Sequence, residues 1–127
     1  MALTLATAGR NAAASGFGTA LNSGKLKIYT SGGSASGTLL ATFSFAATAF
    51  GTAATGTITA AGFPQTVAAA ASGTAAAYEL YASDGTTLVG SGTVTMTSGG
   101  GDITVDNTNI ATGQNITLNS FTHTQPA

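Results

Sequence analysis

Few side chains in this sequence could act as an acid, a base, a nucleophile or a metal ligand. The whole acidic and imidazole set is His123, Glu79, Asp84, Asp102 and Asp106. General acid–base catalysis needs a positioned acid and base whose pKa values are tuned by their surroundings. A Ser-His-acid triad would have to use His123, the only histidine, which is more simply explained as part of a terminal strand or tail. We therefore expect no catalytic site in this chain.

Metal and cofactor sites are equally poorly supported by the sequence. Asp102 and Asp106 lie four residues apart and could share a cation with Asn107 or Asn109. Calcium, however, takes six to eight oxygen ligands at defined loop spacing, so turn and strand-edge roles explain these residues better. The glycine-rich stretches 31–34 and 99–101 lack the Lys-Ser/Thr ending of a phosphate-binding loop. With no cysteine, thiolate metal sites and disulfides are excluded, and we expect no cofactor.

Two of the acidic residues have simple structural explanations. Asp84 with Gly85 forms the dipeptide most typical of a tight β-hairpin turn. Glu79 falls in an expected strand, where we expect it to pair with Lys25 or Lys27 across the sheet as a surface charge pair that contributes little stability.

The composition is the most unusual property of the chain. Ala, Thr, Gly and Ser make up 79 of the 127 residues, whereas charged residues make up only 6%. The mean hydropathy of +0.31 and the net charge of −1 favour a folded chain over a disordered one. A surface of hydroxyls and exposed backbone, with so little charge, gives little repulsion between copies. We expect a homo-oligomer; the alternative is a monomer solvated by its Thr and Ser hydroxyls.

The same composition argues against several classes of partner. Three basic residues are too few for a patch that follows a phosphate backbone, so no nucleic-acid partner is expected. The sequence contains no run of 18 apolar residues, so no membrane span is expected. The first residues lack the basic region of a secretory signal, so none is expected.

The pattern of apolar residues predicts one domain over residues 1–127, with an N-terminal helix at about 4–21 and a β domain at about 25–124. In the helix, Thr4 is the expected N-cap. The residues that recur at three- and four-residue steps, and so form the predicted face, are Leu3, Ala6, Arg10, Ala13, Phe17 and Leu21. From Lys25 onward the period changes to two, which is typical of half-buried strands. The expected strands are 25–29, 39–45, 53–61, 75–82, 86–97, 103–105 and a bulged strand over 116–123, with a Gly/Ser loop at 31–37. A bulge is expected at Gly90 or Gly92, and another near residues 119–120.

This order predicts a mainly β fold. Six to eight short strands with frequent turn signals favour an antiparallel β-sandwich or barrel-like domain preceded by one helix. Most aromatic residues fall on the expected core faces. Tyr29, Phe63 and Tyr81 lie near turns or out of phase, so they are candidates for an interface as well as for the core.

Several segments, taken together, resemble a family of small virion structural proteins of tailed bacteriophages. The first is Thr-Leu-Ala-Thr-Ala-Gly-Arg-Asn-Ala at residues 4–12, followed by Gly-Thr-Leu-Leu-Ala-Thr-Phe at 37–43 and Phe-Gly at 50–51. The others are Ser-Asp-Gly-Thr-Thr at 83–87, Asp-Asn-Thr-Asn-Ile at 106–110 leading to Gly-Gln at 113–114, and the closing segments Ser-Phe-Thr at 120–122 and Gln-Pro-Ala at 125–127. These motifs are structural and span nearly the whole sequence.

The resemblance implies a capsid decoration, or cement, protein located in the virion and assembled in the host cytoplasm. Its partners would be the major capsid protein, at the joints between capsid subunits, and copies of itself. Two alternatives remain open: a tail-tube, tail-terminator or fibre-associated component, and a carbohydrate- or host-surface-binding module that would use Tyr29, Phe63 and Tyr81.

Overall fold

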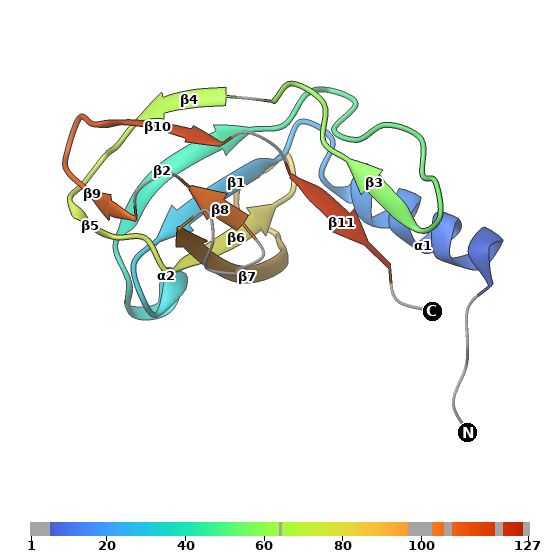
Figure 1. Ribbon diagram of the computed structural model, residues 1–127, viewed down its shortest axis with the longest axis horizontal. Helices are drawn as coiled ribbons and strands as arrows, with labels where there is room; N and C mark the ends of the chain where they lie inside the picture. The colour runs from blue at the N-terminus through green and yellow to red at the C-terminus, as the bar shows by residue number, and fades with distance from the viewer. Residues whose placement is uncertain (1–5, 64, 97–102, 106–107, 119–120, 126–127) are drawn as a thin grey trace.

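A computed structural model describes residues 6–63, 65–96, 103–105, 108–118 and 121–125 (Figure 1). Neither of the helices within these ranges is long and apolar enough to cross a membrane. The helices are α1 (Thr7–Ala20) and α2 (Gly33–Ser36), and the strands are β1 (Lys25–Tyr29), β2 (Leu39–Ser44), β3 (Thr57–Thr59), β4 (Gln65–Ala68), β5 (Gly73–Thr74), β6 (Ala77–Tyr81), β7 (Leu88–Met96), β8 (Ile103–Val105), β9 (Asn109–Ile110), β10 (Asn115–Leu118) and β11 (Thr122–Thr124).

The largest sheet has the strand order β2-β1-β6-β7-β8. All its pairs are antiparallel except β7 with β8, which run parallel. Strand β1 has the bounds that its alternating pattern predicts. Leu26 and Ile28 are fully buried on one face of the sheet, and Lys25 and Lys27 lie on the other.

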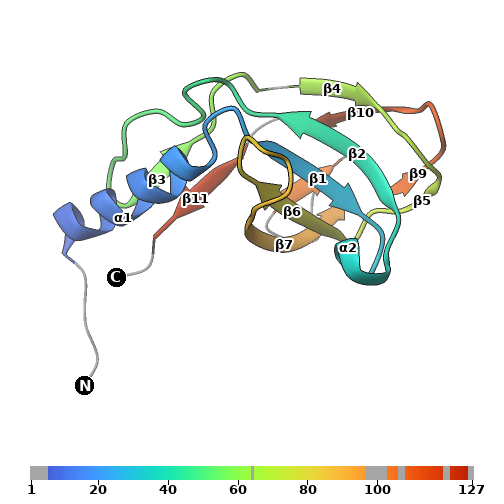
Figure 2. The ribbon, with the colours of Figure 1, turned by 180° about the vertical axis from the view of Figure 1, so that it is seen from behind.

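Three two-stranded ribbons complete the β structure: β10 with β4, β11 with β3, and β5 with β9. The β4–β10 ribbon lies next to β2, and β4 contacts β2, as both ribbon views show (Figures 1 and 2). The β3–β11 ribbon extends away from this layered body together with α1, and forms an arm (Figure 2). The mainly β class with one N-terminal helix and antiparallel sheets is therefore confirmed.

Helix α1 packs on the β3–β11 ribbon through a narrow face. Its buried residues are Ala14 and Gly18, followed by Leu21 at the C-cap. A Cβ on Gly18 would lie 3.1 Å from side-chain atoms of Ile58 and Phe50, so glycine here allows helix and ribbon to approach closely.

The observed helix differs in two respects from the predicted one. It begins at Thr7 instead of Thr4, and Ala6 in extended conformation precedes it; Thr4 lies outside the described residues. Ala6 and Ala13, which belong to the predicted apolar face, are exposed, because the helix turns Ala14 and Gly18 toward β3 instead.

A continuous aromatic cluster joins the body to the arm. The ring of Phe45 lies 5.7 Å from Phe50, 6.0 Å from Phe63 and 6.2 Å from Phe121 between ring centroids. Phe121 also packs edge-on against Tyr78 of β6, at 5.9 Å. Because such pairs add to the burial of apolar area, this cluster fixes the arm on the sheet.

The hairpin expected at Asp84-Gly85 is present. Gly85 has a φ of +73°, and Ala82 and Thr87 are joined by a backbone hydrogen bond of 3.0 Å. The bulge in β7 falls at Val89, because Leu80 pairs with Gly90 while Tyr81 pairs with Leu88. The predicted bulge sites, Gly90 and Gly92, thus lie one and three residues C-terminal to the observed bulge.

The other differences arise from long-range pairing. The expected single strand over 116–123 is two strands, since β10 pairs with β4 and β11 pairs with β3; residues 119–120 lie outside the described residues. The expected strand over 53–61 is regular only at 57–59, flanked by isolated bridges. The expected loop at 31–37 contains α2.

Candidate functional site

The three aromatic residues expected at an interface do not gather on one surface. Tyr29 and Tyr81 are 7% and 8% exposed and lie on the face of the large sheet opposite the core. Phe63 is half-buried and packs against Phe43 and Phe45 at the margin of the core. Their role at an interface stays a prediction, but together they offer no continuous aromatic platform in this chain.

Tyr81 belongs instead to a polar cluster centred on Glu79. Glu79 is 9% exposed and is the only charged residue among the buried side chains of the described chain. Its Oε2 accepts hydrogen bonds from the backbone N–H of Ser34, at 2.9 Å, and from the Ser34 hydroxyl, at 3.1 Å. Its Oε1 accepts a hydrogen bond from the Tyr81 hydroxyl. The expected description of Glu79 as a surface residue is therefore wrong.

Helix α2 is what buries Glu79. It packs over β1 and β6 and places Gly33 directly against the carboxylate, where a Cβ would lie 2.5 Å from Oε2. Gly33 also has a φ of +57°, which disfavours any side chain. No local sequence signal predicts this contact, because Ser34 and Glu79 are 45 residues apart.

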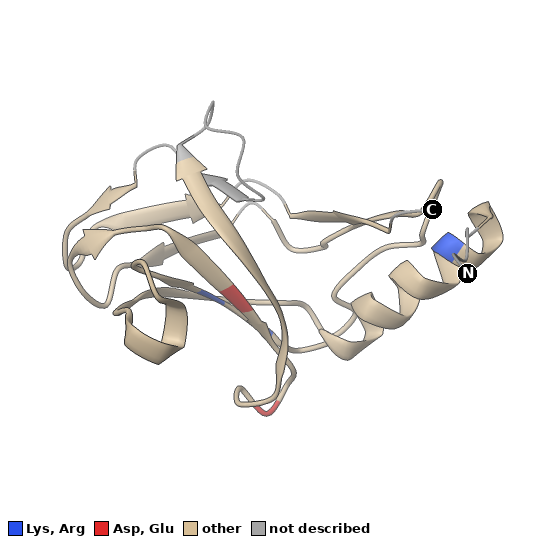
Figure 3. Ribbon diagram, turned by 90° about the horizontal axis from the view of Figure 1, so that it is seen from below, with Lys and Arg blue, Asp and Glu red and all other residues tan. Residues whose placement is uncertain are grey.

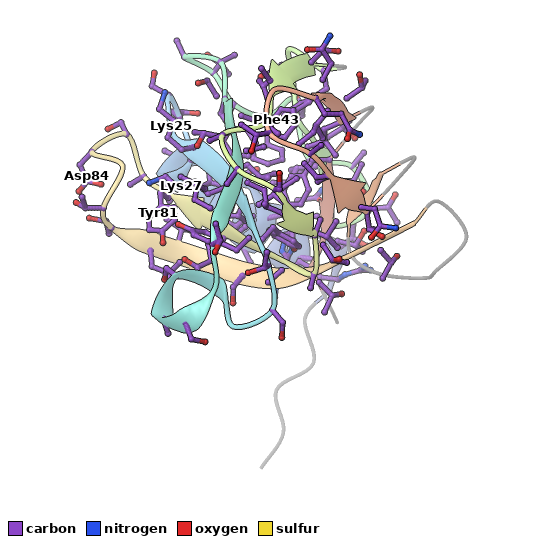
Figure 4. All side chains as sticks on the ribbon, turned by 90° about the vertical axis from the view of Figure 1, so that its left-hand side faces the viewer. Lys25, Lys27, Phe43, Tyr81 and Asp84 are labelled. Atoms are coloured by element: carbon purple, nitrogen blue, oxygen red, sulfur yellow. The ribbon has the colours of Figure 1, made fainter. Side chains whose placement is uncertain are left out.

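Lys27 covers the other side of the cluster. Its Nζ lies 4.6 Å from the centre of the Tyr81 ring and donates a hydrogen bond of 3.3 Å to the Gly85 carbonyl in the hairpin turn. Figure 4 shows Lys27 and Tyr81 close together, near the turn that carries Asp84. Lys27 lies opposite Glu79 in the register of β1 and β6, so Lys27 is the lysine that faces Glu79 across the two strands. The Glu79 carboxylate at this position is shielded from solvent and does not lie on an open surface.

The cluster fixes the ionisation state of both of its acidic groups. Burial by itself raises the pKa of Glu79, but the hydrogen bonds from Tyr81 and Ser34 and the charge of Lys27 outweigh it, so the pKa lies below its ordinary value of 4.5. The hydrogen bond to Glu79, with burial, raises the pKa of Tyr81 to about 12. Glu79 is thus an anion and Tyr81 a neutral donor at neutral pH. This arrangement clamps α2 to the sheet.

The remaining ionisable residues are dispersed. Asp84 accepts hydrogen bonds from Thr87 and Thr86 in its own turn, which lower its pKa to about 2. The His123 ring lies 4.5 Å from the Phe17 ring, and its Nε2 lies 3.4 Å from Gln125 Oε1. Asp102 and Asp106 lie outside the described residues. Within the described residues, no three His, Cys, Asp or Glu side chains lie close enough together to hold a metal.

A pocket of about 300 Å³ lies between the arm and the body. Helix α1, strands β6 and β7, and strand β11 surround it, and its lining is Phe17, Tyr78, Leu80, Gly90, Ser91, Phe121, Thr122, His123 and Thr124. The lining contains no Asp, Glu, Lys or Arg side chain, and its apolar side chains Leu80 and Phe121 are almost fully buried.

Two strand edges border this pocket. Phe121 and Gln125 exchange backbone hydrogen bonds with Ala60 and Gly56 on the β3 side. Because backbone groups alternate in direction along a strand, the N–H and C=O groups of Thr122 and Thr124 point away from β3. Sequence reasoning missed this site, since it treated residues 116–123 as one strand.

The edge of β7 follows the same rule. Val94 donates a backbone hydrogen bond to Ala76, so Ser91 directs its own backbone groups away from β6. Strand β8 covers that side of β7 only at residues 94–96. Within the part of the chain that the structure describes, no strand pairs with Ser91 on this side or with the outer edge of β11.

Comparison of this chain with models of known protein families, with curated proteins and with solved structures finds no match.

Proposed function

We propose that this chain is a non-catalytic structural subunit of a protein assembly. The observation that carries the proposal is the surface charge. In the described residues, charged positions are confined to α1, the β1–β6 pair and the hairpin turn, as Figure 3 shows. The rest of the exposed surface consists mainly of Ala, Thr, Ser and Gly.

Most of these charges are engaged within the chain. Arg10 Nε donates a hydrogen bond of 2.9 Å to the Gln125 carbonyl, and Lys25 Nζ donates one of 3.0 Å to the Ser44 hydroxyl. Lys27 and Glu79 belong to the clamp under α2. Such a surface repels neighbouring subunits little, and it loses little charge solvation when neighbours cover it.

The assembly we propose is the bacteriophage virion, with this chain as a capsid decoration protein. The support is the resemblance of its sequence segments to small virion structural proteins, together with this surface. The chain would bind over joints between major capsid subunits and stabilise the shell by mass action, because it binds the assembled state only. At a free concentration of about 100 times Kd, each occupied site adds about 2.7 kcal/mol.

The geometry favours this role over a carbohydrate-binding module. A sugar platform needs exposed aromatic ring faces, whereas Tyr29 and Tyr81 are buried beneath α2 and the hairpin. Phe63 lies in the aromatic cluster that joins body and arm.

The test is the copy number of this chain in purified particles, measured by quantitative protein staining against the major capsid protein. A decoration protein gives a ratio near one, or a simple fraction of one. A ratio of a few per cent would overturn the decoration role and favour a tail component instead. Absence from particles would overturn the virion assignment.

A further inference from the structure

We propose that Asp84-Gly85 is a site of aspartate isomerisation that the hairpin turn protects, so that it reacts only when the turn opens. The sequence contains this one Asp-Gly pair and no Asn-Gly pair. Because glycine has no Cβ, the peptide nitrogen that follows the aspartate is sterically open to reaction. The Asp84 side chain is exposed, so its protection comes from the turn and not from burial. The proposal goes beyond the structural role given above and does not depend on it.

The reaction needs no reactant except water. The backbone nitrogen of Gly85 attacks Cγ of Asp84, and a new N–Cγ bond closes a five-membered imide. The proton of that nitrogen leaves with the hydroxyl group of the neutral carboxyl as one molecule of water. Water then reopens the ring: attack at Cγ restores aspartate, and attack at the main-chain carbonyl carbon of Asp84 gives isoaspartate, whose backbone runs through Cβ and Cγ.

The closed turn engages the atoms that this reaction must free. The Gly85 N–H donates a backbone hydrogen bond of 2.9 Å to the Ala82 carbonyl, and this bond is lost when the nitrogen gives up its proton. Asp84 Oδ1 accepts hydrogen bonds from the N–H groups of Thr86, at 2.9 Å, and Thr87, at 2.8 Å, and Oδ2 accepts one from the Thr87 hydroxyl. Whichever carboxyl oxygen leaves, at least one of these bonds is lost with it.

The glycine is also held through its carbonyl group. Lys27 Nζ donates a hydrogen bond of 3.3 Å to the Gly85 carbonyl, and the Ala82 N–H donates one of 3.0 Å to the Thr87 carbonyl across the turn. Lys27 belongs to β1, so a strand outside the hairpin helps to anchor the turn. Figure 4 shows Asp84 on the turn and Lys27 near it. Gly85 is thus bound at its N–H and its carbonyl, which restricts the rotation that ring closure requires.

The charge of Asp84 adds to this protection. The carboxyl is attacked in its neutral form, because a carboxylate repels the nucleophile and has no hydroxyl group to release. Hydrogen bonds from the Thr87 hydroxyl and from the N–H groups of Thr87 and Thr86 lower the pKa of Asp84 from 3.8 to about 2. Since each pKa unit is a factor of ten, the neutral share of this carboxyl at neutral pH is roughly 60-fold smaller than in an open chain.

The first test compares folded chain with chain unfolded in urea, both aged at the same neutral pH and temperature. Isomerisation is measured, after unfolding and digestion, with an endoproteinase that cuts before aspartate but not before isoaspartate. Loss of the cut before Asp84 reports the reaction, and the cut before Asp102 is the internal standard. We expect the folded chain to react on the order of 10- to 100-fold more slowly. Equal rates, or no isoaspartate in the unfolded chain, would overturn the proposal.

Matched variants test which contacts protect the site. Thr87→Val removes the hydroxyl that binds Oδ2 but keeps the N–H, so it should speed isomerisation of the folded chain several-fold, whereas Thr87→Ser keeps the hydroxyl and should react like the wild type. Lys27→Met frees the Gly85 carbonyl and should also speed the reaction. Its control is Lys25→Met, because Lys25 binds the Ser44 hydroxyl and not the turn.

All four variants should react at the wild-type rate in urea, where the turn is open. Near-ultraviolet circular dichroism checks that each folded sample keeps its tertiary structure. If Thr87→Val and Lys27→Met both leave the folded rate unchanged, the turn contacts do not protect the site and the proposal fails.

Hydrogen exchange at the Gly85 amide gives an independent measure of turn opening. Exchange and ring closure both require the hydrogen bond from Gly85 to Ala82 to break. Folding should therefore slow isomerisation by at least the factor by which it slows exchange of this amide. A smaller effect on isomerisation would mean that the closed turn itself reacts, and would overturn the proposal.

Discussion

Replacing Glu79 by Gln tests whether the buried carboxylate clamps α2 to the sheet. Glutamine keeps the size of the side chain and can accept from Ser34 through its carbonyl oxygen, while its NH₂ group donates to the Tyr81 hydroxyl. What is lost is the charge. Hydrogen bonds to an ionised group contribute about 1.5–3 kcal/mol, against about 1 kcal/mol for neutral ones. Because burial of the charge offsets part of this difference, we expect the free energy of unfolding at neutral pH to fall by about 1–2 kcal/mol.

The pH dependence makes this prediction specific. The folded pKa of Glu79 lies below its ordinary value of 4.5, so the contribution of the anion is present above that value and is lost as the pH falls through the folded pKa. The gap in stability between wild type and Glu79→Gln should therefore be full at neutral pH and should close in acid. Denaturant unfolding followed by tyrosine fluorescence at a series of pH values measures it. A gap that is absent at neutral pH, or that persists unchanged in acid, would refute the clamp.

The remaining predictions concern packing and titration. Gly18→Val should lower the free energy of unfolding by about 1–3 kcal/mol, because its Cβ meets buried side chains at 3.1 Å, whereas Gly16→Ala, with nothing within 4 Å, should raise it by up to about 1 kcal/mol; thermal unfolding compares the two. Tyr81 should titrate at about 12, losing its stabilising contribution as the pH rises through that value, and Glu79→Gln should bring its pKa down toward the ordinary 10.0; tyrosinate absorbance reports both. Asp84 should titrate at about 2 by nuclear magnetic resonance, and its contribution to the hairpin should persist in acid until the pH falls through that value; a titration near 3.8 would mean that its turn hydrogen bonds do not form in solution.

Local signals in the sequence were sufficient for much of the fold. The alternation in Lys25–Tyr29 predicts β1 with its observed bounds, because one face of that strand is buried and the other is polar. The Asp84-Gly85 dipeptide predicts the hairpin, because glycine supplies the positive φ that the turn requires. In both cases the determining interactions lie within a few residues.

The features that sequence reasoning missed depend on contacts between distant segments. The alternation of its strand places Glu79 on a face that the sequence leaves open to solvent. In the structure α2 covers this face, and its residue Ser34, which binds the Glu79 carboxylate, lies 45 residues earlier in the sequence. Residues 116–123 were expected to form one strand because their phase change could be absorbed by a bulge. In the structure β10 and β11 diverge to different partners, because β10 pairs with β4 and β11 pairs with β3.

The proposed role predicts that the chain stabilises a shell that it does not build. The most direct measurement is the temperature at which purified particles assembled without this chain are disrupted, before and after purified chain is added back. We predict that disruption moves to higher temperature as chain is added and reaches a plateau when its sites are filled. A disruption temperature that does not respond to added chain, in particles to which the chain is shown to bind, would contradict the account.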